Sequence, residues 1–323
     1  MPDSKPMQYR VVHRVADDRG GERERVIAAL VAIPASISPK YFYDELGCAL
    51  YGAICRLPEY YPTRTEVAIF RDYRSEIADA IGPGTQFVDL GAGDCCKALA
   101  WLPFLNPSRY VAVDIAGAEI ERALARMAPD FPEIEMVGVV ADFTTGIPVD
   151  DVLDDRPATF FYPGSSIGNF TPPEALAFLR IVRAQCARRP GSRLMIGVDA
   201  KKSKRVLDAA YDDALGVTGA FNRNVLLHLN ARFGFDFDHA GFRHVAFYNE
   251  AEGRIEMHLE ALRARSVRLD GRERRFAAGE RIHTENSYKY RGEEFEAILR
   301  EAGFTSVRRW SSPDEGYFVF LAA

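Results

Sequence analysis

Residues 86–97 read QFVDLGAGDCCK, a short apolar run followed by a glycine turn and the start of a helical stretch. The run predicts a strand over residues 86–90, and the stretch after it predicts a helix over residues 97–105. Gly91 and Gly93 permit a sharp turn in which the backbone comes close to a ligand at the carboxyl end of the strand. A strand, a glycine turn and a helix in this order are typical of a nucleotide-binding α/β fold.

The segments around this unit continue the alternation of helices and strands. Apolar residues recur at helical spacing in three stretches, residues 66–81, 118–127 and 172–187. Short apolar runs predict further strands over residues 110–115, 134–141, 158–162 and 193–198. Because parallel strands are joined by crossover helices, this pattern predicts a doubly wound α/β sheet with helices on both faces.

The alternation breaks after Asp199. Two helical stretches and a hairpin-like pair of strands are predicted next, over residues 204–215, 220–233, 243–248 and 254–263. The earlier pattern resumes near the C-terminus with a helix and two strands, over residues 293–302, 307–310 and 317–321. We therefore expect a Rossmann-like cofactor-binding domain and a discontinuous α+β substrate-binding domain, formed by residues 63–199 plus 290–323 and by residues 1–62 plus 200–289. The polar segment 17–25 is expected to be a loose arm.

The bulk composition excludes several kinds of protein. The chain has 323 residues, is 47% hydrophobic and carries a formal net charge of −5, so it has no excess of cations to neutralise nucleic-acid phosphates. No run approaches the roughly 18 apolar residues that span a bilayer, and the N-terminus lacks the apolar region of a signal peptide. The cysteines and histidines show no spacing typical of a metal site, so we expect no metal. We expect a cytoplasmic monomer that binds neither nucleic acid nor membrane and acts on a small molecule.

Acidic residues follow the second and third predicted strands as the glycine turn follows the first. Asp114 lies about 20 residues beyond the turn, where a carboxylate accepts hydrogen bonds from ribose hydroxyls. Asp142 could accept from an adenine amino group, and Phe143 could stack beside the base. A pyrophosphate site usually has a third glycine, but Cys96 occupies that position, which disfavours a nicotinamide dinucleotide and favours S-adenosylmethionine. Lys97 could pair with the carboxylate of that cofactor or lie exposed on the helix surface.

Several polar segments outside the glycine turn are dense in groups that can orient a small zwitterion. They are residues 42–44, 57–66, 164–170, 211–213 and 221–224, which read FYD, LPEYYPTRTE, GSSIGNF, YDD and FNRN. Together they resemble the histidine-specific Nα-methyltransferase family of ergothioneine biosynthesis, which converts L-histidine to its trimethylated betaine, hercynine. The resemblance runs from about Ser38 to the C-terminus. It implies a class I methyltransferase fold with S-adenosylmethionine as the methyl donor and a free amino acid as the substrate.

The resemblance also assigns individual residues by their positions in these motifs. The residues that it implies contact S-adenosylmethionine are Gly91, Lys97, Asp114, Asp142 and Phe143. The residues that it implies surround the amino acid are Tyr60, Gly164, Asn169, Tyr211, Met257, Glu285 and Ser287. Asn169 and Tyr211 would lie near the substrate carboxylate. Tyr43 would lie beside the amine and is the candidate catalytic residue.

The resemblance implies that Glu285 and Ser287 recognise the imidazole ring of the substrate. A carboxylate that accepts a hydrogen bond from a ring N–H would select imidazole over an apolar ring. The residue pattern alone also fits an exposed strand carboxylate paired with a neighbour such as Lys289. The chain departs from the family pattern at residues 94–96, where Asp-Cys-Cys replaces the familiar Thr-Ser-Glu, and this leaves the details of the cofactor loop open.

Methyl transfer from a sulfonium is an in-line displacement, so it requires positioning and no covalent nucleophile. The α-ammonium must lose a proton first, and the sequence assigns no histidine or carboxylate base to it. We expect solvent or a tyrosine-bound water to take this proton, with Tyr43 orienting the water. Three other functions stay open: a methyltransferase of the same family acting on tryptophan or another amino acid, a nicotinamide-dependent oxidoreductase, and a non-catalytic S-adenosylmethionine-binding module.

Overall fold

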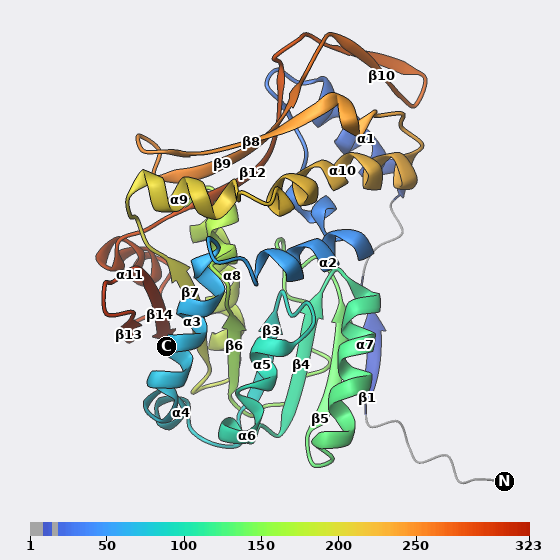
Figure 1. The fold of residues 1–323 in the computed structure, drawn as a ribbon. Coiled ribbons are helices and arrows are strands. Elements are labelled where there is room, and N and C mark those ends of the chain that lie inside the picture. Colours follow the sequence, from blue (N-terminus) through green and yellow to red (C-terminus); the bar gives the residue numbers. More distant parts are fainter. Residues whose placement is uncertain (1–8, 15–18) are drawn as a thin grey trace, which may run out of the picture.

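The computed structural model describes residues 9–14 and 19–323. Figure 1 shows a large sheet flanked by helices and, beyond one end of its strands, a smaller unit built around a second sheet. The large sheet has eight strands and the second has four. A separate hairpin of β10 (Arg265–Leu269) and β11 (Arg272–Phe276) projects from the smaller unit. No helix of the described residues is long and apolar enough to cross a bilayer.

The strands of the large sheet lie in the order β1-β5-β4-β3-β6-β7-β14-β13. Their bounds are β1 (Tyr9–His13), β3 (Gln86–Leu90), β4 (Arg109–Asp114), β5 (Glu135–Val140), β6 (Ala158–Tyr162), β7 (Arg193–Asp199), β13 (Val307–Ser311) and β14 (Tyr317–Ala322). β14 pairs antiparallel with β7 and β13, whereas the other neighbours pair parallel. The chain winds outward from β3 in one direction and from β6 in the other, so the switch point lies between these two strands. The predicted doubly wound fold is confirmed.

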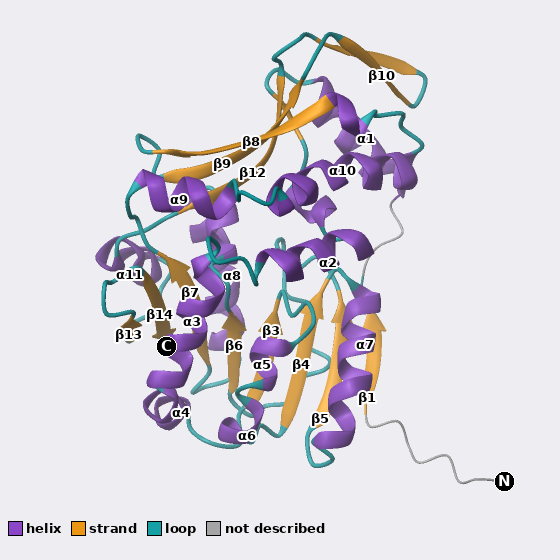
Figure 2. Cartoon of the chain, viewed as in Figure 1, coloured by secondary structure: helices purple, strands orange, loops and turns teal. Residues whose placement is uncertain are grey.

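Helices cover both faces of this sheet (Figure 2). One face carries α8 (Pro172–Ala187) and α11 (Gly292–Glu301). The other carries α3 (Tyr61–Asp72), α4 (Arg74–Ile81), α5 (Cys96–Leu99), α6 (Leu102–Leu105) and α7 (Gly117–Met127). Since successive strand side chains point to opposite faces, Val88 lies in the core beneath α8, whereas Phe87 stacks on Phe161 in the other core with ring centroids 5.2 Å apart.

Two predicted helices are each interrupted. The predicted helix 66–81 is α3 followed by α4, because the backbone leaves helical geometry at Tyr73, with φ −110° and ψ 14°. Apolar side chains on both sides of the break share one core, so their spacing does not reveal it. The predicted helix 97–105 is α5 followed by α6, because Pro103 is tolerated in the first turn of a helix and not in its interior.

The smaller unit has a core of its own. Its strands, in spatial order, are β2 (Ala35–Ser36), β12 (Arg281–Tyr288), β9 (Arg254–Ala261) and β8 (Phe242–Asn249). Its helices are α1 (Arg19–Val31), α2 (Glu45–Ile54), α9 (Lys204–Tyr211) and α10 (Val217–Phe233). The single turns of 3-10 helix are η1 (Pro39–Phe42) and η4 (His239–Gly241) in the smaller unit, η2 (Ala128–Asp130) after α7, and η3 (Ser166–Asn169) after β6. The sequence did not predict β12 or the hairpin of β10 and β11, and it extended the helix that ends at Tyr211 to residue 215.

The N-terminal segment also differs from its prediction. Residues 19–25, expected to belong to a loose arm, form the first half of α1, because Glu22 accepts hydrogen bonds from Tyr41 and from Arg232 of α10. Residues 17–18 of that expected arm lie outside the described residues. Long-range partners of this kind cannot be read from local composition.

The structure differs from the predicted domain boundaries at two places. β1 pairs with β5 at the edge of the large sheet, so residues 9–13 do not belong to the smaller unit to which the segment 1–62 was assigned. The boundary between residues 62 and 63 falls inside the first turn of α3. The large sheet therefore draws on the N-terminal segment as well as on the two stretches predicted for it.

Candidate functional site

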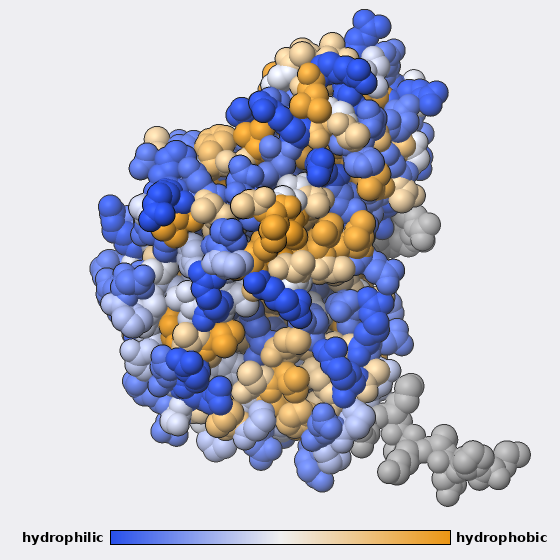
Figure 3. All heavy atoms as spheres, in the orientation of Figure 1, coloured by the Kyte–Doolittle hydropathy of each residue, from blue (hydrophilic) through white to orange (hydrophobic). Residues whose placement is uncertain are grey.

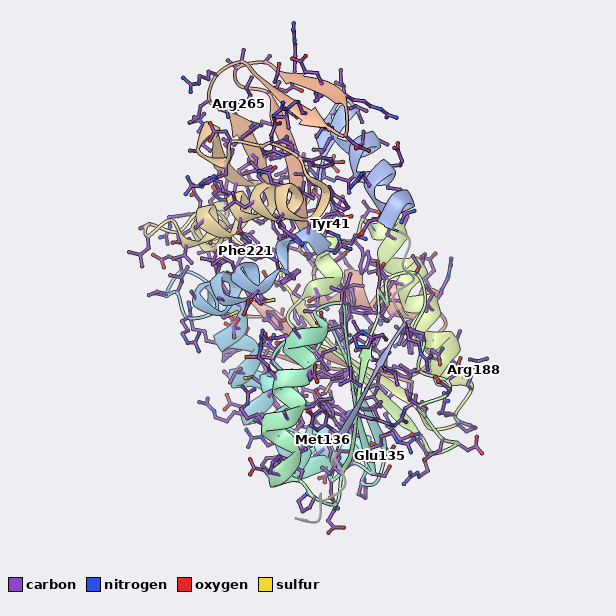
Figure 4. The ribbon with its side chains drawn as sticks, turned by 90° about the vertical axis from the view of Figure 1, so that its right-hand side faces the viewer. Tyr41, Glu135, Met136, Arg188, Phe221 and Arg265 are labelled. Atoms are coloured by element: carbon purple, nitrogen blue, oxygen red, sulfur yellow. The ribbon has the colours of Figure 1, made fainter. Side chains whose placement is uncertain are left out.

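The carboxyl ends of β3, β4, β5 and β6 meet at the edge of the large sheet that faces the smaller unit. Figure 4 shows this polarity, because Glu135, the first residue of β5, lies at the far end of the sheet from Phe221 in the smaller unit. Gly91 follows β3 and Gly164 follows β6, so both flank the switch point. Ligands of doubly wound sheets bind outside the carboxyl ends of the strands at this point.

The glycine turn is tied to the next strand by one carboxylate. Gly91 and Gly93 have φ values of 73° and 52°, in the left-handed region that favours glycine. The Asp114 carboxylate accepts one hydrogen bond from the Gly93 amide and one from the Ala116 amide, both 2.9 Å long. Burial raises the pKa of Asp114, and these amide hydrogen bonds oppose that rise. Asp114 therefore holds the turns after β3 and β4 in a fixed relation.

The next predicted pair lies beside this turn. The ring of Phe143 is 3.7 Å from the position that a β-carbon on Gly91 would take, and it meets Tyr162 edge to face at 5.9 Å. Asp142 is exposed, and one of its oxygens accepts from the Thr144 amide at 3.1 Å. The structure thus brings Gly91, Asp114, Asp142 and Phe143 to adjacent strand ends. A flat ring, two carboxylates and a turn without a side chain fit a nucleoside.

The structure excludes one of the two positions that the sequence suggested for Lys97. Its Nζ lies 2.6 Å from Glu66, a fully buried carboxylate on α3, so Lys97 is not simply a surface residue. The other Glu66 oxygen accepts from the Gly164 amide and from the Tyr317 hydroxyl, each at 2.7 Å. A β-carbon on Gly164 would lie 2.9 Å from Lys97 Nζ. Lys97 is therefore fixed beside the switch point, and its contact with a cofactor stays a prediction.

A cavity lies where the sheet edge meets the smaller unit. Its lining includes every residue that the sequence analysis placed around the substrate, which are Tyr43, Tyr60, Gly164, Asn169, Tyr211, Met257, Glu285 and Ser287. These residues come from the segment after η1, the start of α3, the loop around η3, the end of α9, β9 and β12. The fold therefore gathers widely separated segments around one space.

The cavity is also lined by side chains that the sequence analysis left unassigned. They include Tyr51, Ile54, Ser165, Ser166, Ala210, Thr218 and Phe221. Thr218 and Phe221 are three residues apart on α10, so they share one face of that helix. Phe221 begins one of the polar segments quoted above. Its spacing of three residues from Thr218, which is typical of one helix face, could have placed both residues in the site.

α2 forms one wall of the cavity. Its inner side contributes Tyr51 and Ile54, whereas Leu46 on its outer side is 52% exposed. Figure 3 shows apolar side chains gathered on the surface at the level of α2 and α10. α2 therefore has one side on the cavity and one side on solvent.

Tyrosines line the cavity in edge-to-face pairs. Tyr43 meets Tyr51 with ring centroids 5.9 Å apart, and Tyr60 meets Tyr211 at 6.0 Å. Burial raises the pKa of the Tyr43 and Tyr60 hydroxyls well above their usual value. These groups keep their protons at neutral pH, so Tyr43 can orient a water or an amine but cannot act as a ready base.

Glu285 and Ser287 lie two residues apart on β12 and face the same cavity. Glu285 pairs with Met257 of β9 next to an irregularity in the strand register, and it is only 7% exposed. Burial raises the pKa of Glu285 to about 7, and the charge of Lys289 opposes the rise. The alternative of an exposed Glu285 paired with Lys289 is wrong, because Glu285 is buried and the Lys289 ammonium pairs with Asp199.

Within the described residues, no three His, Cys, Asp or Glu side chains are grouped so as to hold a metal ion.

The chain matches, over residues 22–323, a family described as histidine-specific, S-adenosylmethionine-dependent methyltransferases. It is 39% identical to a histidine N-alpha-methyltransferase of Mycolicibacterium smegmatis, with 98% of this chain and 99% of that protein covered. It is 35% identical to a histidine N-alpha-methyltransferase of Mycobacterium tuberculosis, with 98% and 100% covered.

A more distant relative carries a different substrate in its name. A 4-dimethylallyltryptophan N-methyltransferase of Trichophyton verrucosum is 26% identical, with 89% of each chain covered. The family match, in contrast, spans both the sheet edge and the smaller unit that closes the cavity. The chain therefore belongs to the family of histidine-specific, S-adenosylmethionine-dependent methyltransferases and is an enzyme.

Proposed function

We propose that this enzyme transfers three methyl groups in turn from S-adenosylmethionine to the α-amine of L-histidine and so forms hercynine, the first step of ergothioneine biosynthesis. The observation that carries the proposal is the cavity beside the switch point, where the buried Glu285 carboxylate shares one lining with Asn169 and the tyrosines. A zwitterion with an imidazole side chain offers a partner to each of these groups.

The residues at the glycine turn would hold the methyl donor. Each carboxylate oxygen can accept two hydrogen bonds, so Asp114 can bind ribose hydroxyls while it keeps its backbone contacts. Asp142 would accept from the adenine amino group beside the ring of Phe143. Lys97 would offer its ammonium group to the methionine carboxylate as well as to Glu66. When bound, S-adenosylmethionine supplies an electrophilic methyl group on a sulfonium centre.

The substrate would be held at both of its ends. Asn169 would donate a hydrogen bond to the carboxylate, with Tyr211 beside it, and Met257 would pack against the side chain. Glu285 would accept from one ring nitrogen, while Ser287 would serve the other. Anchoring at two ends fixes the amine against the methyl group, and positioning of this kind removes roughly 7–11 kcal/mol of barrier in favourable cases.

The walls around the amine suit a nitrogen that becomes progressively methylated. Tyr43, Tyr51 and Phe221 line the same cavity, and their rings attract a quaternary ammonium through cation–π and dispersion contacts. The Tyr43 hydroxyl, which stays protonated, would orient the water that accepts the amine proton. A trimethylated nitrogen has no N–H left to donate, so the product is held at nitrogen by these rings alone.

The main alternative is a sibling activity on tryptophan or another indole. An indole has one N–H and no acceptor nitrogen, so Glu285 and Ser287 could not both find a partner. The test is incubation with S-adenosylmethionine and a panel of free amino acids, followed by mass spectrometry. We expect methylated histidine and no methylated tryptophan.

A Glu285→Leu variant sharpens this test. Removing a charged hydrogen-bond acceptor is expected to lower kcat/KM for histidine about tenfold to a hundredfold. An exposed residue outside the cavity, Glu250, provides the control Glu250→Leu. Methylation of tryptophan in place of histidine, or equal effects of the two variants, would overturn the substrate assignment.

A further inference from the structure

Lys289 is a fully buried cation directly behind the cavity. Its side chain is 0% exposed, and its Nζ lies 2.9 Å from Asp199, the last residue of β7. It also donates to the Tyr211 hydroxyl at 2.9 Å and to the Ser287 hydroxyl at 2.8 Å. An ammonium group has three N–H donors and no acceptor, so these contacts use all of them. Neither Tyr211 nor Ser287 can send its own proton to Lys289.

The two hydroxyls that receive these bonds also bond to each other, with 2.9 Å between Tyr211 Oη and Ser287 Oγ. They own two protons between them, and only one of these can lie on the line that joins the oxygens. The second proton must point elsewhere, and both side chains line the cavity. The network therefore offers the cavity one O–H donor, whichever way the bond between the hydroxyls runs.

We propose that Lys289 is a positioning residue for the substrate, which holds the Tyr211 and Ser287 hydroxyls so that one of them donates into the cavity beside the Glu285 acceptor. This inference rests on the proposed function, because the match is with a histidine side chain and carboxylate. An acceptor and a forced donor on one wall complement a neutral imidazole, which has one N–H and one bare nitrogen. Lys289 itself does not line the cavity and acts through the two hydroxyls.

A purely structural role for Lys289 makes a different prediction. Asp199 is also bonded to Lys202 Nζ and to the Tyr61 hydroxyl, each at 2.6 Å. Loss of Lys289 therefore does not leave Asp199 without a counter-charge. Lys202 touches neither hydroxyl of the network and does not line the cavity, so it is a matched control on the same carboxylate.

The test compares Lys289→Met with Lys202→Met in the full chain, by steady-state kinetics with histidine and by direct binding of S-adenosylhomocysteine. We expect Lys289→Met to raise the KM for histidine about tenfold or more, while the dissociation constant of S-adenosylhomocysteine stays within about twofold of wild type. Lys202→Met is expected to keep the wild-type KM. Equal KM values for the two variants, or a parallel loss of S-adenosylhomocysteine binding, would assign Lys289 a structural role and overturn the inference.

Three further variants make the result specific. If Lys289 acts through Ser287, the KM effects of Lys289→Met and Ser287→Ala are not additive in the double variant, whereas additive effects contradict the inference. Lys289→Gln keeps two N–H donors and serves as the second variant should Lys289→Met fail to fold. Its KM is expected to exceed that of wild type, and an unchanged KM overturns the inference. Wild-type enzyme that does not methylate histidine overturns the proposed function before any variant is compared.

Discussion

Glu285 makes the ligand-free protein less stable as the pH rises. Its pKa is raised to about 7 in the folded state, with burial as the main cause, whereas an unfolded glutamate titrates near its ordinary value of 4.5. The folded state therefore holds a proton between these values that the unfolded chain has lost. The contribution to stability is complete below about pH 4.5 and is lost as the pH rises through about 7.

Replacing Glu285 by glutamine should remove this loss. We expect Glu285→Gln to be more stable than wild type at pH 8 by on the order of 1–3 kcal/mol, and the difference should disappear near pH 4.5. Urea unfolding across this pH range measures it, with Glu250→Gln as the exposed control. A difference that does not change with pH would contradict the raised pKa.

Tyr43 offers a second test at the level of one atom. The Tyr43 hydroxyl stays protonated and would orient the water that accepts the amine proton. Tyr43→Phe removes this hydroxyl, so it should slow methyl transfer about tenfold and leave histidine binding nearly unchanged. The matched control is Tyr41→Phe, which removes a hydroxyl bonded to Glu22 outside the cavity. Full rates for every methylation step in Tyr43→Phe would eliminate this role.

Sequence motifs name single residues more reliably than they name partners. Lys97 was identified as a candidate from its place after the glycine turn, but its partner Glu66 lies on a different helix. Lys289 was considered only as a neighbour of Glu285, whereas its partner Asp199 ends a strand of the other sheet. Each pairing depends on how α3 and β12 pack, and local spacing does not contain that information.

At the scale of elements, Gly84 provides a control for the glycine turn after β3. Gly91 and Gly84 have nearly equal φ values of 73° and 72°, so alanine at either position should cost about 1–2 kcal/mol of stability. Only Gly91 lies beside Phe143, whereas nothing lies within 4 Å of a β-carbon on Gly84. Isothermal titration should show weaker S-adenosylmethionine binding for Gly91→Ala alone. Equal affinities in the two variants would remove the turn from the cofactor site.

The elements that the sequence predicted well are those whose pattern reports burial. β3 to β7 are short apolar strands, and the sequence predicted each of them to within one residue of its bounds. β12 escaped prediction because RIHTENSY has polar residues at buried positions, including Thr284, Glu285 and Ser287. A strand that carries substrate contacts departs from the apolar alternation for that reason. β1 escaped because its partner, β5, lies far along the chain.

For the whole molecule, the two units should unfold together. The chain crosses between them several times, and the buried pair of Asp199 and Lys289 joins β7 to the end of β12. We expect calorimetry to show one transition, which shifts upward as a whole when histidine and S-adenosylhomocysteine are present. At a hundred times its dissociation constant, one ligand adds about 2.7 kcal/mol. Two transitions, of which histidine shifts only one, would show that the cavity does not couple the units.

We propose that residues of both units select histidine and direct all methyl groups to its α-nitrogen. The most direct measurement is fragmentation mass spectrometry of the product formed from L-histidine and S-adenosylmethionine. We expect three methyl groups, all on the α-nitrogen, and an unmodified imidazole. Methyl groups on the imidazole ring, or methylation of tryptophan while histidine is left unmodified, would contradict it.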